Sequence, residues 1–218
     1  MQGVYPNLRG IVLGIFYFFV NLRCKITNRE CKYDIIYYVD NEKEFDAMQR
    51  SFQKDEYVFY ESGGICKILD IQLAPLEGMP ADREYYIMRS LHDKSGLLYV
   101  PKDNPNIFIR PLLNEQNAEV LLSTLSQILP ITEQNGKLLR TKYLEAMQLH
   151  QPCEWVRIIK TAYNRKNEFP DRVQRLSEGE RNLVARAKCF LYTELSLALD
   201  IPEKEMAERM EQALLASL

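Results

Sequence analysis

The hydrophobic pattern of this chain changes near residue 114, and that change decides the class of fold that the chain can adopt. Between residues 55 and 113, short runs rich in β-branched and aromatic residues alternate with turns that contain glycine or proline. From residue 115 onward, apolar residues recur instead at the spacing of an amphipathic helix. Strands that come first and helices that follow predict an α+β fold.

Five short strands are expected in the first part of the chain. They lie around residues 57–59, 65–71, 84–91, 96–100 and 106–110, with a glycine turn at Ser62-Gly63-Gly64 and a loop over 74–83. Strands this short and this closely spaced favour a small β-barrel. Such a barrel usually leaves an edge that a partner strand can extend, although strands that simply close the barrel are equally compatible with the pattern.

The second part predicts an all-α bundle of about four helices, preceded by a helical connector. The expected helices cover residues 115–128, 137–149, 152–166 and 177–198, and Pro202 opens a last one. Ser177 and Glu180 have the spacing of a capping box. Trp155 lies on the apolar face of its helix, so we assign it to the core.

The first fifty residues fit neither pattern. Gly10 to Val20 form an apolar run that is too short to cross a bilayer, and no small-residue cleavage site follows it. Lys43-Glu44 can be encoded by a ribosome-binding sequence just upstream of Met48. Residues 1–47 are therefore either native or a translated leader that ends at Met48, and both alternatives stay open.

These patterns divide the chain into four segments. Residues 1–54 are interpreted as a leader or non-native extension, 55–113 as the barrel, 114–134 as the connector and 135–218 as the helical domain.

Charge is distributed unevenly over these segments. Residues 55–134 carry 6 Lys/Arg against 12 Asp/Glu, residues 135–190 carry 12 against 6, and residues 191–218 carry 2 against 6. A basic helical region beside an acidic β region indicates two different partners. The alternative is that the helices carry ordinary solvated charge.

Cysteine and histidine usage argues against a metal site and against catalysis. The five cysteines form no CxxC pair, and the two histidines lie far apart in the sequence, so we expect neither a zinc site nor a disulfide framework. Cys66 and Cys189 sit in apolar patterns typical of the core of a cytoplasmic protein. His150 and Cys153 could belong to a hydrolase, but no orienting group or oxyanion motif accompanies them.

The ordered set of motifs resembles the CarD/CdnL family of bacterial transcription regulators over roughly residues 55–212. The most specific parts are Tyr99-Val100-Pro101-Lys102-Asp103-Asn104 and Leu176-Ser177-x-Gly179-Glu180-Arg181. The resemblance implies a Tudor-like domain that binds the RNA polymerase β subunit by strand addition. It also implies a helical domain that touches promoter DNA and stabilises the open complex. It implies no enzymatic activity, cofactor, small-molecule ligand or membrane partner.

The resemblance also points to contact residues. The expected polymerase contacts are Gln72, Leu73, Leu98 and Tyr99. Among the expected DNA contacts, the resemblance points to Arg140, Lys142 and Tyr143. The basic charge of the helical region adds Lys160, Arg165, Lys166, Arg181 and Arg186, and these contacts are expected mainly with phosphates.

Two departures from the family pattern affect this interpretation. Gly136 occupies the position where members often place a tryptophan that wedges into the minor groove. Leu73 and Tyr99 stand where some members use arginine to meet polymerase. A second hypothesis is therefore an adaptor that binds polymerase without productive DNA contact.

Overall fold

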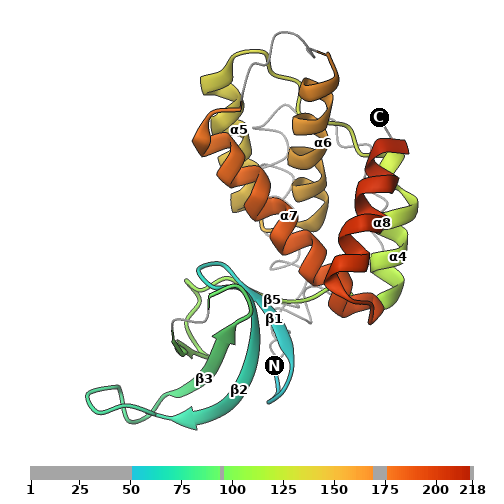
Figure 1. Ribbon diagram of the computed structural model, residues 1–218. Coiled ribbons are helices and arrows are strands. Elements are labelled where there is room, and N and C mark those ends of the chain that lie inside the picture. The colour runs from blue at the N-terminus through green and yellow to red at the C-terminus, as the bar shows by residue number, and fades with distance from the viewer. Residues whose placement is uncertain (1–50, 94–95, 169–175, 217–218) are drawn as a thin grey trace, which may run out of the picture. The chain divides into compact units, whose positions relative to one another are not determined.

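The computed structural model describes residues 51–93, 96–168 and 176–216. Residues 50–218 form one compact unit, in which a sheet precedes a set of helices (Figure 1). The predicted α+β class is confirmed. Expectations for residues 1–50 lie outside the described residues.

The sheet is antiparallel and has five strands in the order β4-β3-β2-β1-β5. Every strand lies where the sequence predicted one. Their bounds are β1 Tyr57–Tyr60, β2 Gly64–Leu73, β3 Glu84–Ser90, β4 Leu98–Pro101 and β5 Ile109–Pro111. Among the described strands, no pairing joins β4 to β5, so the barrel that the pattern favoured is an open sheet here.

The core of the sheet forms on one face of its central strands. Val58, Ile68, Met88 and Val100 are buried together there. A register shift between Ile68 and Asp70 places an extra residue, Leu69, in β2. Such a bulge bends the strand and increases its local twist, here beyond the residues of β2 that pair with β1.

The domain begins earlier than residue 55, the boundary expected from the sequence. Phe52 is buried in the same core and packs edge-on against Tyr86, with ring centroids 6.1 Å apart. Its backbone N–H donates to the Tyr86 hydroxyl over 3.1 Å. The boundary was placed too late because one phenylalanine among polar residues gives no strand or helix periodicity.

The helices agree closely with the predicted ranges. They are α4 Glu115–Ser123, the 3-10 turn η1 Leu125–Gln127, α5 Gly136–Gln148, α6 Pro152–Glu168, α7 Glu178–Leu199 and α8 Glu203–Ala216. The predicted connector is thus two pieces rather than one helix. Helix α7 contacts α4, α5, α6 and α8, so it is the centre of this part. None of the described helices is long and apolar enough to cross a membrane.

Two predicted details of the helices are confirmed. The capping box at the start of α7 is present, with Ser177 Oγ accepting from the Glu180 N–H and the Glu180 carboxylate accepting from the Ser177 N–H. Trp155 is fully buried. Both features are local or periodic, which is why the sequence alone shows them.

Candidate functional site

The outer edge of β4 is the first candidate site. Strand β4 pairs with β3 on one side, and no backbone hydrogen bond from the described residues reaches its other side. Lys102 donates its N–H to the Glu84 carbonyl over 3.0 Å. Along an antiparallel strand, the backbone N–H and C=O groups of successive residues point in turn towards the partner strand and away from it. Lys102 points towards β3, so Tyr99, three residues earlier, turns its N–H and C=O away from β3. Pro101 has no N–H, which limits the open edge to a short stretch.

The four predicted polymerase contacts do not share this edge. Leu98 and Tyr99 belong to β4, with Leu98 packed partly against the core. Gln72 and Leu73 lie at the far end of β2, on the other side of β3. Leu73 is 62% exposed, whereas the Gln72 amide donates to Asp70 over 2.7 Å.

A second candidate surface consists of exposed cations on α5 and α7. Arg140, Arg181 and Arg186 are all exposed, as is Lys137. A β-carbon on Gly179 would lie 3.0 Å from Arg140 Nε, so Arg140 lies across the first turn of α7. The absence of a side chain at Gly179 therefore brings a cation of α5 against the start of α7.

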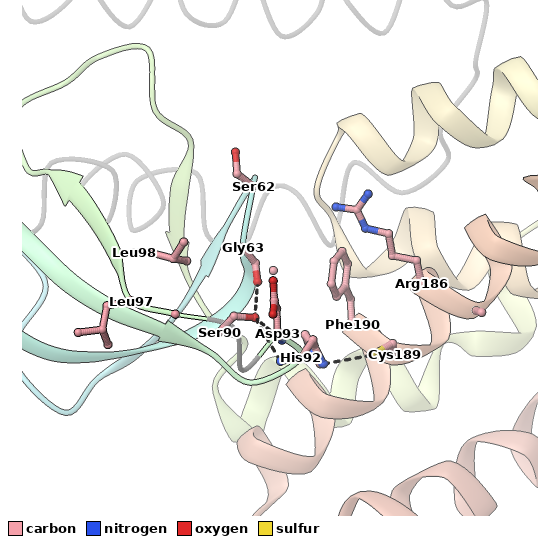
Figure 2. A pocket seen from close by; sticks show the side chains of 13 residues that line it. Ser62, Gly63, Ser90, His92, Asp93, Leu97, Leu98, Arg186, Cys189 and Phe190 are labelled. Atoms are coloured by element: carbon pink, nitrogen blue, oxygen red, sulfur yellow. Dashed lines mark hydrogen bonds between the residues drawn. The ribbon is translucent and has the colours of Figure 1, made fainter.

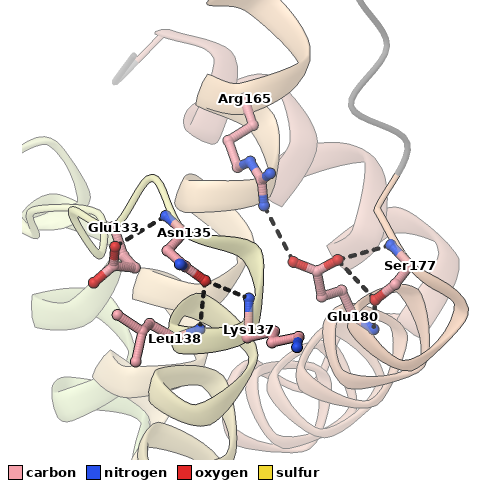
Figure 3. Close-up of polar contacts among 7 residues, drawn as sticks. All are labelled: Glu133, Asn135, Lys137, Leu138, Arg165, Ser177 and Glu180. Atoms are coloured by element: carbon pink, nitrogen blue, oxygen red, sulfur yellow. Dashed lines mark hydrogen bonds and ion pairs between the residues drawn. The ribbon is translucent and has the colours of Figure 1, made fainter.

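The beginning of α5 adds to the positive potential of this surface. The Asn135 side chain accepts from the N–H groups of Lys137 and Leu138, and the first turn of α5 contains no acidic residue (Figure 3). A helix N-terminus carries partial positive charge, which no acidic residue within the turn offsets here. The Glu133 carboxylate, just before the helix, accepts from the Asn135 N–H over 3.0 Å and offsets part of it. A β-carbon on Gly136 would meet nothing within 4 Å, so this position is open.

Several predicted DNA contacts are held inside the protein instead. Tyr143 is fully buried, so its ring offers no surface for stacking on a base. Lys160 is buried and donates from Nζ to the Leu125 carbonyl over 2.9 Å. Arg165 pairs with Glu180 over 3.1 Å (Figure 3). Lys142 stays partly exposed but pairs with Glu133 over 3.1 Å. The Lys166 side chain lies outside what the structure describes.

Sequence reasoning placed these residues on the surface because it counted charge without assigning partners. The periodicity of α6 places Lys160 away from the face that carries Trp155 and Ile159, so its burial carries no sequence signal. The pairing of Arg165 with the capping-box glutamate carries no sequence signal, because it joins two separate helices.

A junction between the sheet and the helices was not predicted at all. Arg110 of β5 donates two hydrogen bonds to the Glu194 carboxylate of α7, over 2.7 and 2.8 Å. It also donates to the His150 carbonyl over 3.0 Å, and its guanidinium lies over the rings of Phe59 and Trp155. The Glu194 side chain has no exposed surface. This is a buried, bidentate pair in which both charges are well hydrogen-bonded.

Aromatic rings surround that ion pair. The Phe59 ring lies 5.3 Å from Trp155 and 5.4 Å from Phe190, and His150 packs between Phe59 and Phe108. Gly64, which has a positive φ of 69°, lets α7 approach the sheet, since a β-carbon there would lie 2.6 Å from the Phe190 ring. The junction therefore depends on residues from β1, β2, β5, α6 and α7.

Burial at and near this junction predicts how stability depends on pH. Desolvation lowers the pKa of both His92 and His150. Below about pH 6.5, the usual histidine pKa, the unfolded chain binds protons that the folded protein does not. We expect the free energy of unfolding to fall as the pH drops from about 6.5 towards the lowered pKa values. Urea unfolding at several pH values measures this, and the fall should shrink in His150→Gln. If the free energy of unfolding of that variant fell with pH as steeply as that of the parent protein, His150 would not be a source of the pH dependence.

The described residues contain no group of three or more His, Cys, Asp or Glu side chains arranged to hold a metal ion. Comparison with known proteins bears instead on the sheet. Residues 52–113 match the family described as the CarD-like/TRCF RID domain. No curated protein matches the chain. The matched segment starts at the buried Phe52 and ends just after β5, so it covers the whole sheet.

Proposed function

We propose that this chain is a CarD-like, RNA polymerase-interacting protein that regulates transcription, because its residues 52–113 match the CarD-like/TRCF RID domain. In this proposal the sheet binds the β subunit of polymerase and the helical part binds promoter DNA. Holding both partners together would change the stability of the open complex. The protein would then act in the cytoplasm, where the polymerase works.

One observation supports the polymerase contact above all others: β4 presents an unpaired edge at Tyr99, as far as the described residues extend. An extended segment of the polymerase can add to that edge as a further strand, with the backbone groups of Tyr99 supplying the hydrogen bonds. The exposed Leu97, just before β4, supplies apolar area next to this edge, whereas the exposed Leu73 lies at the end of β2, on the other side of β3. Because neither of the expected family arginines is present, the contact we propose is more apolar than charged.

Replacing Tyr99 tests strand addition directly. We expect Tyr99→Pro to weaken binding of the full chain to the polymerase β subunit by at least tenfold, because proline removes the outward N–H and about 1.4 kcal/mol corresponds to that factor. Tyr99→Ala keeps the backbone groups and should lose much less affinity. Binding is measured by titration with purified polymerase, on variants whose melting curves match the parent protein. A folded Tyr99→Pro that binds normally would exclude strand addition at β4.

The proposed DNA contact is supported by the exposed cations Lys137, Arg140, Arg181 and Arg186. Lysine and arginine side chains on a surface neutralise phosphates, which gives affinity without base specificity. The sequence contains no motif that reads the major groove. We therefore propose that side chains of α5 and α7 contact the phosphate backbone of DNA.

The adaptor hypothesis keeps the polymerase contact and drops the DNA contact. It is favoured by Gly136, where the family pattern has a wedge residue, and by the pairing of Arg165 and Lys142 within the protein. Salt-dependent binding to duplex DNA distinguishes the two hypotheses.

A further inference from the structure

A cavity beside the junction contains a cysteine and a histidine that neither the polymerase contact nor the DNA contact uses. The cavity has a volume of about 530 Å³. Its walls come from the β1–β2 turn, the end of β3, the start of β4 and one side of α7 (Figure 2). It therefore lies where the sheet meets the central helix.

Cys189 of α7 and His92, just after β3, form a close pair in this cavity. The Cys189 Sγ lies 3.1 Å from His92 Nδ1 (Figure 2). The other ring nitrogen, Nε2, is buried and has no hydrogen-bond partner among the described residues. A neutral imidazole has one donor and one acceptor nitrogen, so Nδ1 can accept the thiol proton while Nε2 carries the ring proton.

The surroundings keep this pair neutral at rest. Burial raises the pKa of the Cys189 thiol, and the nearby Glu203 carboxylate raises it further. Burial lowers the pKa of His92, against the opposing effect of Glu203. Asp93 and Arg186 also line the cavity. The thiol thus needs a base to react, and the imidazole of His92 lies in direct contact with it.

We propose that Cys189 is a thiol-oxidation site, with His92 as its general base and a small hydroperoxide as its oxidant. The cavity admits a small molecule, and Cys189 is partly exposed within it. This proposal does not depend on the transcriptional role.

The chemistry balances with a hydroperoxide as the only co-reactant. The sulfur attacks the terminal oxygen, so an S–O bond forms while the O–O bond breaks. The thiol proton passes to His92 Nδ1 and then to the departing oxygen, which leaves as water or an alcohol. Sulfur loses two electrons to the hydroperoxide and becomes a sulfenic acid.

The added oxygen changes the contact between α7 and the sheet. Phe190 is the next residue after Cys189, and its ring packs against both Phe59 and His92. Oxidation at Cys189 replaces the thiol–imidazole contact in this same place. The expected consequence is a loosened junction that a reductant restores.

The rest of the chain supplies internal controls. Cys66 is fully buried, so a hydroperoxide has no access to its thiol. Cys153 is partly exposed, as Cys189 is. Cys66 should therefore stay unreactive, and Cys153 gives the rate of an accessible thiol that lies outside this cavity.

The test treats the full chain with dilute hydrogen peroxide, traps sulfenic acid with a dimedone reagent and quantifies each cysteine by mass spectrometry. We expect Cys189 to react at least tenfold faster than Cys153, since a positioned base contributes about 10² or more to such a step. His92→Gln should remove that advantage and abolish the inflection that the histidine gives to the pH profile. Its melting temperature should be checked in parallel.

Two outcomes would overturn the proposal. One is a Cys189 rate no higher than that of Cys153 in the parent protein. The other is an unchanged rate and pH profile in a folded His92→Gln. If His92→Gln fails to fold, His92→Asn is measured in its place. An unchanged Cys189 rate in that variant, or a pH profile of the parent protein without a histidine inflection, would likewise overturn the proposal.

Discussion

Glu194→Ala is expected to lower the free energy of unfolding by about 3–5 kcal/mol, a large fraction of the stability of an ordinary domain. The substitution leaves the Arg110 guanidinium buried without its carboxylate, and it also removes the acceptor for the Leu113 N–H. Breaking one side of a buried pair is costly because the remaining charge has lost both water and partner. Urea unfolding followed by circular dichroism measures the change.

Two controls separate the buried charge from a general effect of the substitution. Glu211→Ala removes a carboxylate from an exposed pair with Lys188, and should cost less than about 1 kcal/mol. The double variant Arg110→Met/Glu194→Leu should lose less stability than Glu194→Ala, because it leaves no buried charge unpaired. A loss below about 1 kcal/mol for Glu194→Ala would show that the pair is not desolvated in solution.

Arg140→Ala/Arg181→Ala is expected to lower the affinity for duplex DNA on the order of 50-fold at about 0.1 M salt. If each arginine neutralises one phosphate, the slope of log affinity against log salt should fall by roughly two units. The measurement is a fluorescence titration of a forked promoter fragment over a range of salt concentrations.

The matched control is Lys204→Ala/Arg209→Ala, which removes two exposed cations from the acidic helix α8. This double variant changes the net charge by the same amount, but its two substitutions lie on a different helix from the proposed surface. Its slope of log affinity against log salt should therefore stay near that of the parent protein. Equal losses in both double variants would indicate non-specific attraction. A salt-independent affinity in the parent protein would favour the adaptor.

Sequence patterns predicted the elements of this fold well because those patterns are local. The glycine turn at Ser62-Gly63-Gly64, the capping box from Ser177 to Glu180 and the apolar stripe of α7 each depend on residues close together in the chain. The structure that each of these features forms follows from backbone geometry and periodicity alone.

The burial and the partner of each charged side chain could not be predicted in the same way. Lys160 and Arg165 were assigned to the surface by their charge, yet one donates to a carbonyl of η1 and the other to a glutamate of α7. Which cation finds a partner depends on how helices pack, and one sequence does not contain that information. Glu194 carried a partial signal, since it occupies the apolar stripe between Leu191 and Leu195. A charge in such a stripe predicts a buried partner but not its identity.

The Arg110–Glu194 pair also bears on the order in which the protein assembles as it is synthesised. The two residues are 84 positions apart, and contacts that distant form only after a large loop has closed. A nascent chain that ends at residue 113 already contains the whole sheet, with Phe59 uncovered and the Arg110 guanidinium still without its carboxylate. We expect such an intermediate to be compact but weakly protected from proteases. The family module is therefore shorter than the stretch of chain that stabilises it. The ribosome must release α7 as well as the sheet before the module reaches its full stability.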